Sequence, residues 1–438
     1  AVQYLWERMK ESGYLYKGSY DGWYCVPDET YFTDTQVQKG DEEYGSVGQH
    51  LCPDCHRPLE RVQEESYFFK LSAFQDKLLK LYDEHPDFVE PAFRMNEVRS
   101  FVEGGLNDLS VSRTSFDWGI QVPFDEGHVT YVWFDALLNY MTAVGYGVDT
   151  DEARAELAYR WPAQFHIVGK DIIRFHCVIW PAMLMAIGEA LPEHVFAHGF
   201  LTVRNAETGK AEKMSKSRGN VINPNDVVAQ YGADTMRLYI MFIGDFEKAA
   251  AWSDNAVKGC KRFLDRVWNL AENLTEEAGY SKANESAVHK TIKKVSDDIE
   301  AMKFNTAIAA LMALVNDFYQ NGCSKGDYAA LLLMLSPFAP HMVEELWETL
   351  GFAAEKGGMA CAQPWPAYDA SKTMDAEVNM AVQVCGKLRG TITVPADSGE
   401  EAVVAAALAD PKVQKFTEGK KLVKTILVPN KLVNLIAK

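Results

Sequence analysis

The chain has 438 residues, of which 47% are hydrophobic and 24% charged, as in an ordinary globular protein of two to four domains. A formal net charge of -17 argues against a surface that binds nucleic acid nonspecifically. There is no apolar run of membrane-spanning length and no secretory signal, so we expect a cytoplasmic protein with no membrane partner. The eight cysteines are scattered, which favours reduced thiols over a disulfide framework.

Apolar residues at helical spacing open the chain and predict a helix over residues 1–15 that ends near Gly13. Ala1 falls in the middle of this pattern, which suggests that an upstream portion is missing. Residues 16–115 follow as short aromatic-rich stretches separated by Gly, Pro and Asp. They contain Cys52 and Cys55, whose two-residue spacing is that of a zinc knuckle.

A strand–helix–strand pattern occupies the next part of the chain. We expect strands at 128–135, 164–169 and 194–200, with helices starting near Ala136 and at Asp171. This spacing is typical of a parallel sheet with crossover helices, whose ligands bind at the carboxyl ends of the strands. The residues at or just after such ends are Gly169, Asp171, His198 and Gly199.

The segment Glu212–Asn220 (EKMSKSRGN) places two lysines, Lys213 and Lys216, in a loop with small and hydroxyl residues. Ammonium groups there would bind the charge that accumulates on departing pyrophosphate, more strongly in the transition state than in the ground state. Ser215 and Ser217 would let the loop open and close. A solvated surface turn is the plain alternative. The segment resembles the second signature loop (KMSKS) of class I aminoacyl-tRNA synthetases.

Helical periodicity after Trp252 predicts a bundle, in which Trp268 and Trp347 occupy core positions. An aperiodic stretch at 351–375 indicates a linker. The remaining residues predict a small α+β domain with strand–turn–strand at 382–394, a helix at 399–409 and a strand at 422–428. Its end carries seven lysines and one acidic residue, which could bind a phosphate backbone or simply aid solubility.

Residues 1 to about 200 resemble methionyl-tRNA synthetases, most clearly in Gly22–Cys25, Val111–Arg113, Tyr131–Tyr140 and Val168–Ile172. From about residue 210 the chain resembles leucyl-tRNA synthetases, in Val221–Pro224, Tyr231–Arg237, Leu335–His341 and Val382–Gly390. The resemblance implies an α/β fold: a partial Rossmann-like catalytic domain with a zinc-knuckle-type insertion, a helical bundle and a small α+β domain. The implied boundaries are 1–15 with 116–254 for the catalytic part, 16–115 for the insertion, 255–350 for an anticodon-binding-type bundle, 351–375 for the linker and 376–438 for a tRNA-contacting domain.

The implied activity is that of a methionine–tRNA ligase. ATP with Mg²⁺ activates methionine, and the acyl group then passes to tRNA without a covalent enzyme intermediate. The resemblance assigns the catalytic role to Lys213 and Lys216, and ATP binding to these two with Gly169, Asp171, His198, Gly199, Ser215 and Ser217. It assigns the methionine side chain to Trp133, Ala136, Leu137, Tyr140, Ile172 and His176.

Three questions stay open at this level. The family's His-x-Gly-His motif does not occur, so the chain could be a fragment, a joining of two genes, or a catalytically silent tRNA-binding module. Leucine is the alternative amino acid, because the C-terminal half resembles leucyl enzymes. A structural zinc is implied at Cys25, Asp28, Cys52 and Cys55, where Asp28 stands in place of a cysteine, and a metal-free knuckle is the alternative.

The basic residues of the last domain resemble those of the leucyl tail that touches the body of the tRNA. The residues that match are Lys387, Arg389, Lys420, Lys421 and Lys424.

Overall fold

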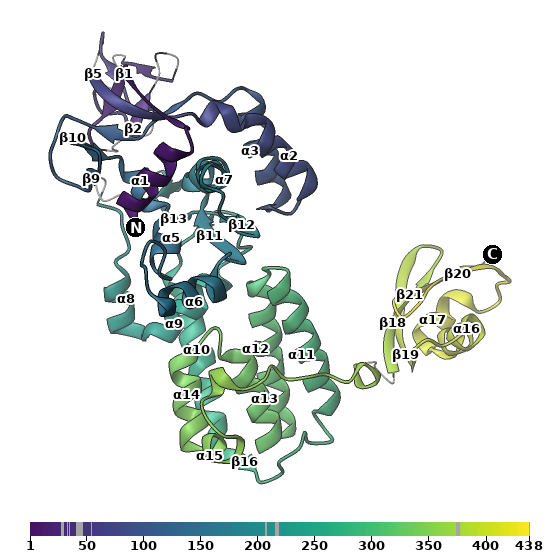
Figure 1. The fold of residues 1–438 in the computed structure, drawn as a ribbon. Helices are drawn as coiled ribbons and strands as arrows, with labels where there is room; N and C mark the ends of the chain where they lie inside the picture. The colour runs from purple at the N-terminus through teal and green to yellow at the C-terminus, as the bar shows by residue number, and fades with distance from the viewer. Residues whose placement is uncertain are drawn as a thin grey trace. The chain divides into compact units, whose positions relative to one another are not determined.

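A computed structural model describes residues 1–27, 30–32, 34, 36–40, 47–53, 55–205, 208–214, 219–373 and 377–437. The chain divides into two compact units, Ala1–Phe200 and Leu201–Lys438, each with its own core (Figure 1). Among the helices within these ranges, none has the length and apolar character needed to cross a membrane.

A parallel sheet lies in the first unit, as the strand–helix–strand pattern predicts. Its strand order is β11 (Phe165–Gly169), β12 (His194–His198) and β6 (Val89–Glu90). Gly169 pairs with His198, so the carboxyl ends of β11 and β12 lie side by side. The helices α1 (Val2–Glu11) and α7 (Trp180–Ile187) bury apolar faces in the core of this unit.

Strand β6 comes from the segment that the sequence assigned to an insertion. Val89 pairs with Val195 at the edge of the parallel sheet, and the flanking helices α2 (Gln75–Glu84) and α3 (Ala92–Glu103) contribute to the same core. The part of 16–115 that stands apart is built on a long antiparallel pair, β1 (Leu15–Cys25) and β5 (Glu60–Phe69).

The strand predicted at 128–135 is wrong in its second half. Strand β10 (Asp125–Thr130) pairs with β8 (Ser112–Arg113) and β9 (Gln121–Val122) in antiparallel fashion, and α4 (Val132–Ala136) follows at once. Val132 is 44% exposed whereas Phe134 is fully buried. Two residues that are two apart would share one face in a strand, so this burial pattern fits a helical turn instead.

The helix predicted from Asp171 consists of three successive segments of different helix type. A 3-10 turn (Lys170–Ile172) leads into a π-helical turn (Phe175–Ile179) and then into α7, which ends at Ile187 with Gly188 as its C-cap. Pro181 lacks the N–H that would bind the Cys177 carbonyl four residues back. The Tyr82 hydroxyl donates to that carbonyl instead, at 2.7 Å.

The second unit begins with a hairpin of β13 (Leu201–Arg204) and β14 (Ala211–Lys213), and β15 (Ala250–Ala251) pairs beside β13. Helices α8 (Pro224–Tyr231) and α9 (Ala233–Phe242) precede a bundle of helices that pack around one core, as predicted: α10 (Asp254–Leu270), α11 (Glu285–Glu300), α12 (Phe304–Asn321), α13 (Lys325–Leu335) and α14 (Pro340–Thr349). Trp347 is buried in this core, but Trp268 is 44% exposed on the flank of α10, so the core position predicted for Trp268 is wrong.

The C-terminal residues form a sheet of order β19-β18-β21-β20 with its own core. The predicted strands and helix are present as β18 (Glu377–Val384), β19 (Lys387–Pro395), α16 (Glu400–Ala409) and β20 (Leu422–Val428). Helix α17 (Pro411–Thr417) and the last strand, β21 (Leu432–Ala437), were not predicted from the sequence.

Candidate active site

A chain of hydrogen bonds joins three of the residues predicted to enclose the amino-acid side chain. The Nδ1 of His176 lies 2.9 Å from the Ile172 carbonyl, and its Nε2 lies 2.8 Å from the Tyr140 hydroxyl. A carbonyl only accepts, so Nδ1 carries the proton. Burial lowers the pKa of His176, with partial opposition from the Ile172 hydrogen bond, and this keeps the ring neutral. Nε2 therefore accepts, and Tyr140 donates its hydroxyl proton.

The remaining predicted pocket residues differ in burial, because two of them are half-buried and one is fully buried. The Trp133 ring stacks on Phe175 with centroids 3.8 Å apart and meets the His176 ring edge-on at 6.3 Å. Trp133 and Ala136 are half-buried, whereas Leu137 is fully buried in the core of the unit. Phe175, which stacks on Trp133, is also part of this site. It was not predicted from the sequence, although it directly precedes His176.

His166 is a second histidine at this site that the sequence analysis missed. It lies on β11, is 4% exposed, and its ring centroid is 4.1 Å from that of Tyr140 and 6.0 Å from that of His176. Burial lowers the pKa of His166 to about 4. The sequence offered no signal for this role, because the exposed positions of the strand, Phe165 and Ile167, are apolar and the buried position is the histidine.

Four of the residues predicted to bind ATP, Gly169, Asp171, His198 and Gly199, lie at the carboxyl ends of β11 and β12. A Cβ atom on Gly169 would lie 2.5 Å from the Asp171 Oδ1, so only glycine lets that carboxylate approach the strand end. His198 pairs with Gly169 in the sheet and uses its Nδ1 to bind the Gly199 carbonyl at 2.8 Å. The structure thus brings these four residues together.

The lysine loop is described at its two ends. Lys213 is exposed at the end of β14, and its carbonyl accepts a hydrogen bond of 3.3 Å from the Asn220 side-chain amide. Gly219, next to Asn220, has a φ of 65°. The predicted residues Ser215, Lys216 and Ser217 lie outside the described residues.

Three of the four predicted metal ligands converge. The Sγ atoms of Cys25, Cys52 and Cys55 all lie within 4.8 Å of one another, and those of Cys25 and Cys55 are 3.5 Å apart. Thiolates about 2.3 Å from a tetrahedral zinc are roughly 3.8 Å apart, so these three fit a shared ion. Asp28 lies outside the described residues.

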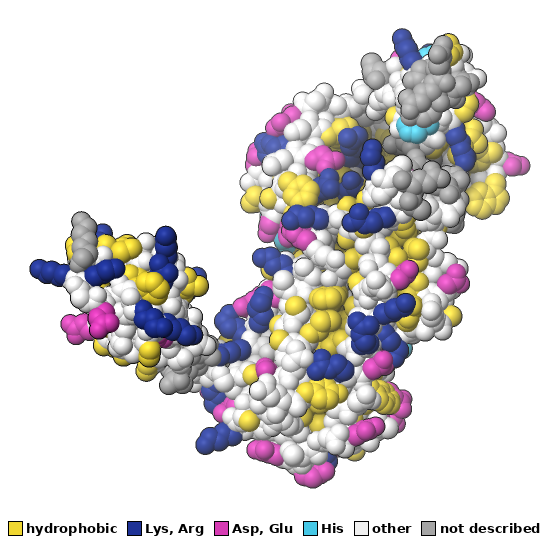
Figure 2. Space-filling view, turned by 180° about the vertical axis from the view of Figure 1, so that it is seen from behind, with side chains coloured by type: hydrophobic (Ala, Val, Ile, Leu, Met, Phe, Trp, Pro, Cys, Tyr) yellow, Lys and Arg dark blue, Asp and Glu magenta, His cyan; other side chains and the backbone are white. Residues whose placement is uncertain are grey.

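The predicted tRNA contacts lie on the C-terminal domain, over which Figure 2 shows Lys and Arg side chains gathered. Lys387, Lys420, Lys421 and Lys424 are exposed. Arg389 is partly buried, and its guanidinium lies 3.8 Å from the centre of the Phe416 ring. Arg389 is therefore held by a cation–π contact within the domain.

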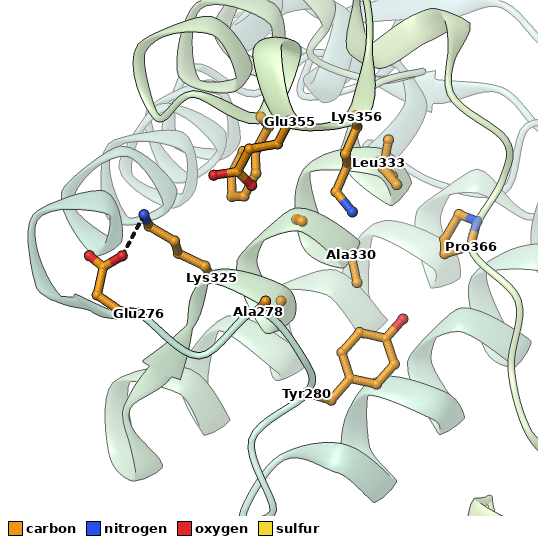
Figure 3. Close-up of a pocket in the computed structure, with 12 residues that line it drawn as sticks. Glu276, Ala278, Tyr280, Lys325, Ala330, Leu333, Glu355, Lys356 and Pro366 are labelled. Carbon is orange, nitrogen blue, oxygen red and sulfur yellow. Dashed lines mark ion pairs between the residues drawn. The ribbon is translucent and has the colours of Figure 1, made fainter.

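A cavity of about 430 Å³ in the second unit is lined by none of the predicted site residues (Figure 3). Its charged lining is Lys325, Lys356, Glu276 and Glu355, and Lys325 forms a 2.6 Å ion pair with Glu276. Two cations balance two anions, so this lining offers no net attraction to phosphate groups.

Comparison with known proteins places this geometry in a family. The family model described as tRNA synthetases class I (M) matches residues 1–273, more than half of the chain. The chain belongs to the class I tRNA synthetases of the M type. A second model, the anticodon-binding domain of tRNA ligase, matches residues 282–404. The synthetase match runs through residue 210, where a change from a methionyl to a leucyl resemblance was expected from the sequence.

Several methionine–tRNA ligases resemble this synthetase chain. The one from Caldanaerobacter subterraneus subsp. tengcongensis is 37% identical over 81% of this chain and 59% of its own length. The one from Brucella suis is 41% identical over 81% of this chain and 73% of its own length. The chain thus spans about 60 to 75% of the length of these two relatives.

Solved synthetase structures agree with this assignment. Mycobacterium tuberculosis methionyl-tRNA synthetase in complex with methionyl-adenylate is 33% identical with a TM-score of 0.67, covering 84% of this chain and 80% of that one. The LeuRS–tRNA–LeuAMS complex from Agrobacterium radiobacter covers all of this chain and 83% of its own with a TM-score of 0.74. Its identity is 17%, so that likeness concerns the fold alone.

Proposed function

We propose that this protein is a methionine–tRNA ligase, which uses ATP to form methionyl-adenylate and then transfers methionine to tRNA. The observation that carries the proposal is the neutral Tyr140–His176–Ile172 chain beside the stacked rings of Trp133 and Phe175. Polarizable aromatic walls suit a thioether, for which a sulfur–aromatic contact contributes about 0.3–1.5 kcal/mol. The family match and the relatives at 37% and 41% identity support the same activity.

The amino-acid side chain is proposed to lie against Trp133, Ala136, Tyr140, Ile172 and His176. Leu137 is fully buried, which favours a supporting role behind the pocket wall over direct contact with the ligand. The donor hydrogens of His176 and Tyr140 are used within the protein, so the pocket presents soft, nearly apolar surfaces to the ligand.

ATP is proposed to bind at the ends of β11 and β12. Gly169 lets the nucleotide approach the backbone, and the Asp171 carboxylate can accept from a ribose hydroxyl. Lys213 and Lys216 are proposed to stabilise the pyrophosphate as it departs, with Ser215 and Ser217 in the loop between and beside them. Mg²⁺ bound to ATP would neutralise part of the phosphate charge. The attacking group is the methionine carboxylate, so the protein's part is positioning and charge stabilisation.

Zinc is proposed as a structural ion held by Cys25, Cys52 and Cys55, with Asp28 as the fourth ligand. The thiols come from two segments of the insertion, Cys25 from the end of β1 and the Cys52/Cys55 pair from the residues after β4 (His50–Leu51), around a small core that includes Phe32 and Leu59. One ion would join these segments where few apolar side chains are available.

Contact with tRNA is proposed for the bundle and for the C-terminal domain. The match of residues 282–404 to the anticodon-binding domain supports the first. The exposed Lys387, Lys420, Lys421 and Lys424 support the second, because exposed ammonium groups can replace the counterions of a phosphate backbone. Arg389 would act here mainly by packing on Phe416.

Exchange of pyrophosphate into ATP tests the amino-acid assignment directly. We expect exchange with methionine and none above background with leucine. Exchange with leucine but not methionine would replace the proposal with a leucine–tRNA ligase. If neither amino acid supports exchange while tRNA binds with a log affinity that falls with log salt, the chain is a tRNA-binding module without catalysis.

A further inference from the structure

We propose that His166 is a positioning residue for the methionine pocket: it holds the Tyr140 ring so that the hydroxyl points to His176. This inference rests on the proposed function, since it concerns the same pocket. His166 does not extend the chain of hydrogen bonds itself. His166 lies on β11, whereas Tyr140 lies on α5 (Asn139–Thr142) and His176 lies on the π-helical turn.

The His166 ring is fixed by a hydrogen bond of its own. The indole Nε1 of Trp180 lies 3.3 Å from His166 Nε2. An indole N–H only donates, so Nε2 must accept, and His166 is the neutral tautomer with its proton on Nδ1. Trp180 is fully buried at the start of α7, so the donor of this hydrogen bond is held in place by the surrounding core.

The fixed ring in turn limits the motion of Tyr140. The centroids of the His166 and Tyr140 rings lie 4.1 Å apart, and the rings are tilted at an interplanar angle of 38°. Tyr140 is half-buried, sits on a helix of four residues, and lacks the extended backbone support of a strand. The Trp161 ring is a further neighbour of His166, with ring centroids 6.1 Å apart. Removing the ring would leave one side of Tyr140 open and allow its hydroxyl to leave His176.

A double-mutant cycle separates positioning from a general structural role. The variant His166→Gln keeps an oxygen that can accept from Trp180 but removes the ring, and Tyr140→Phe removes the hydroxyl that the ring orients. We expect each change to weaken methionine binding about five- to tenfold, the factor for one lost hydrogen bond. The double variant should bind methionine no more weakly than the weaker-binding of the two single variants, because both substitutions act through the Tyr140 hydroxyl.

Binding is measured by calorimetric titration of methionine into the full chain, and KM for methionine and for ATP by pyrophosphate exchange. Only the KM for methionine should rise, and His85→Gln on the surface is the matched control. Effects of His166→Gln and Tyr140→Phe that multiply, or unchanged binding by His166→Gln, would overturn the positioning role. If His166→Gln does not fold, His166→Asn enters the same cycle. Wild-type protein that binds no methionine would refute the proposed function instead.

Discussion

The Asp234 carboxylate accepts a 2.8 Å hydrogen bond from the Nδ1 of His341, a residue 107 positions further along the chain. The same carboxylate accepts from the backbone N–H of Met342 at 2.7 Å. Asp234 lies in the first turn of α9, and His341 and Met342 lie in the first turn of α14. One negative charge therefore stabilises the N-terminal ends of two helices, where unpaired N–H groups carry positive partial charge.

Replacing Asp234 by Ala is expected to lower the free energy of unfolding by about 1–3 kcal/mol, the range for a lost helix cap with a buried backbone donor. His341→Ala should cost less, because the His341 side chain is 74% exposed and water replaces its bond. Urea unfolding of both variants gives this comparison, with Glu348→Ala on the exposed face of α14 as the control. Equal losses for Asp234→Ala and Glu348→Ala would contradict the capping role.

The variant His176→Phe keeps a ring of similar size but removes both hydrogen bonds of His176. The Tyr140 hydroxyl then loses its acceptor and the Ile172 carbonyl loses its donor. We expect the KM for methionine to rise about tenfold with the KM for ATP unchanged, since one or two modest hydrogen bonds are lost. His85→Phe is the matched surface control. A rise in the KM for ATP alone would place His176 at another part of the site.

Lys213→Ala is expected to lower kcat for pyrophosphate exchange about a hundredfold, because a positioned charge at a developing anion contributes in that range. The effect should fall on kcat more than on KM, as the charge on the pyrophosphate is greatest in the transition state. Lys210→Ala, an exposed lysine that precedes β14, is the control and should keep wild-type kcat. Equal loss in both variants would indicate a general effect of surface charge.

Sequence reasoning located the parallel strands and the site at their ends because the pattern there is strong. Strands of five residues, each bounded by turn signals and separated by a long apolar segment, predict β11 and β12. The closeness of Gly169 and His198 follows from parallel topology alone.

The features that the sequence did not reveal depend on tertiary contacts. β6 has only two residues, so its pairing with β12 leaves no periodic signal. The apolar run that ends at Phe134 could be strand or helix, and the antiparallel partners of β10 end the strand at Thr130. His166 looked like an ordinary strand residue, because the rings of Tyr140 and Trp180 that give it a role lie on other elements.

Purified protein is expected to contain one zinc ion per chain, and Cys52→Ser should lose it. Removal of one of three converging thiolates weakens the site and lowers the melting temperature of the insertion by several degrees, since metal binding adds to folding free energy. Metal analysis with thermal melting measures both effects. Cys361→Ser, at an exposed cysteine, is the control. Protein that is purified without zinc, and whose melting temperature is the same as that of Cys52→Ser, would show that neither zinc nor the Cys52 thiol stabilises the insertion.

The free energy of unfolding is expected to decrease as the pH falls from about 6.5 towards 4. The pKa of His166 is about 4 in the folded protein against an ordinary value of 6.5, so the unfolded chain binds a proton that the folded chain does not. The contribution of His166 to the free energy of unfolding is fully present above its ordinary pKa of 6.5. Below that pH the contribution decreases by up to about 1.4 kcal/mol per pH unit. The lowered pKa of His176 acts in the same direction.

Urea unfolding at about pH 7.5, 6.5, 5.5 and 5.0, across the window where the histidine of the unfolded chain takes up its proton, measures this slope. The pKa values of Glu65 and Asp125 are lowered from values of 4.5 and 3.8, so these carboxylates affect stability only at lower pH. His166→Phe should flatten the dependence between pH 6.5 and 5.0, whereas His85→Phe should leave it as in the wild type. A slope that His166→Phe does not change would mean that His166 is charged or exposed in the folded protein.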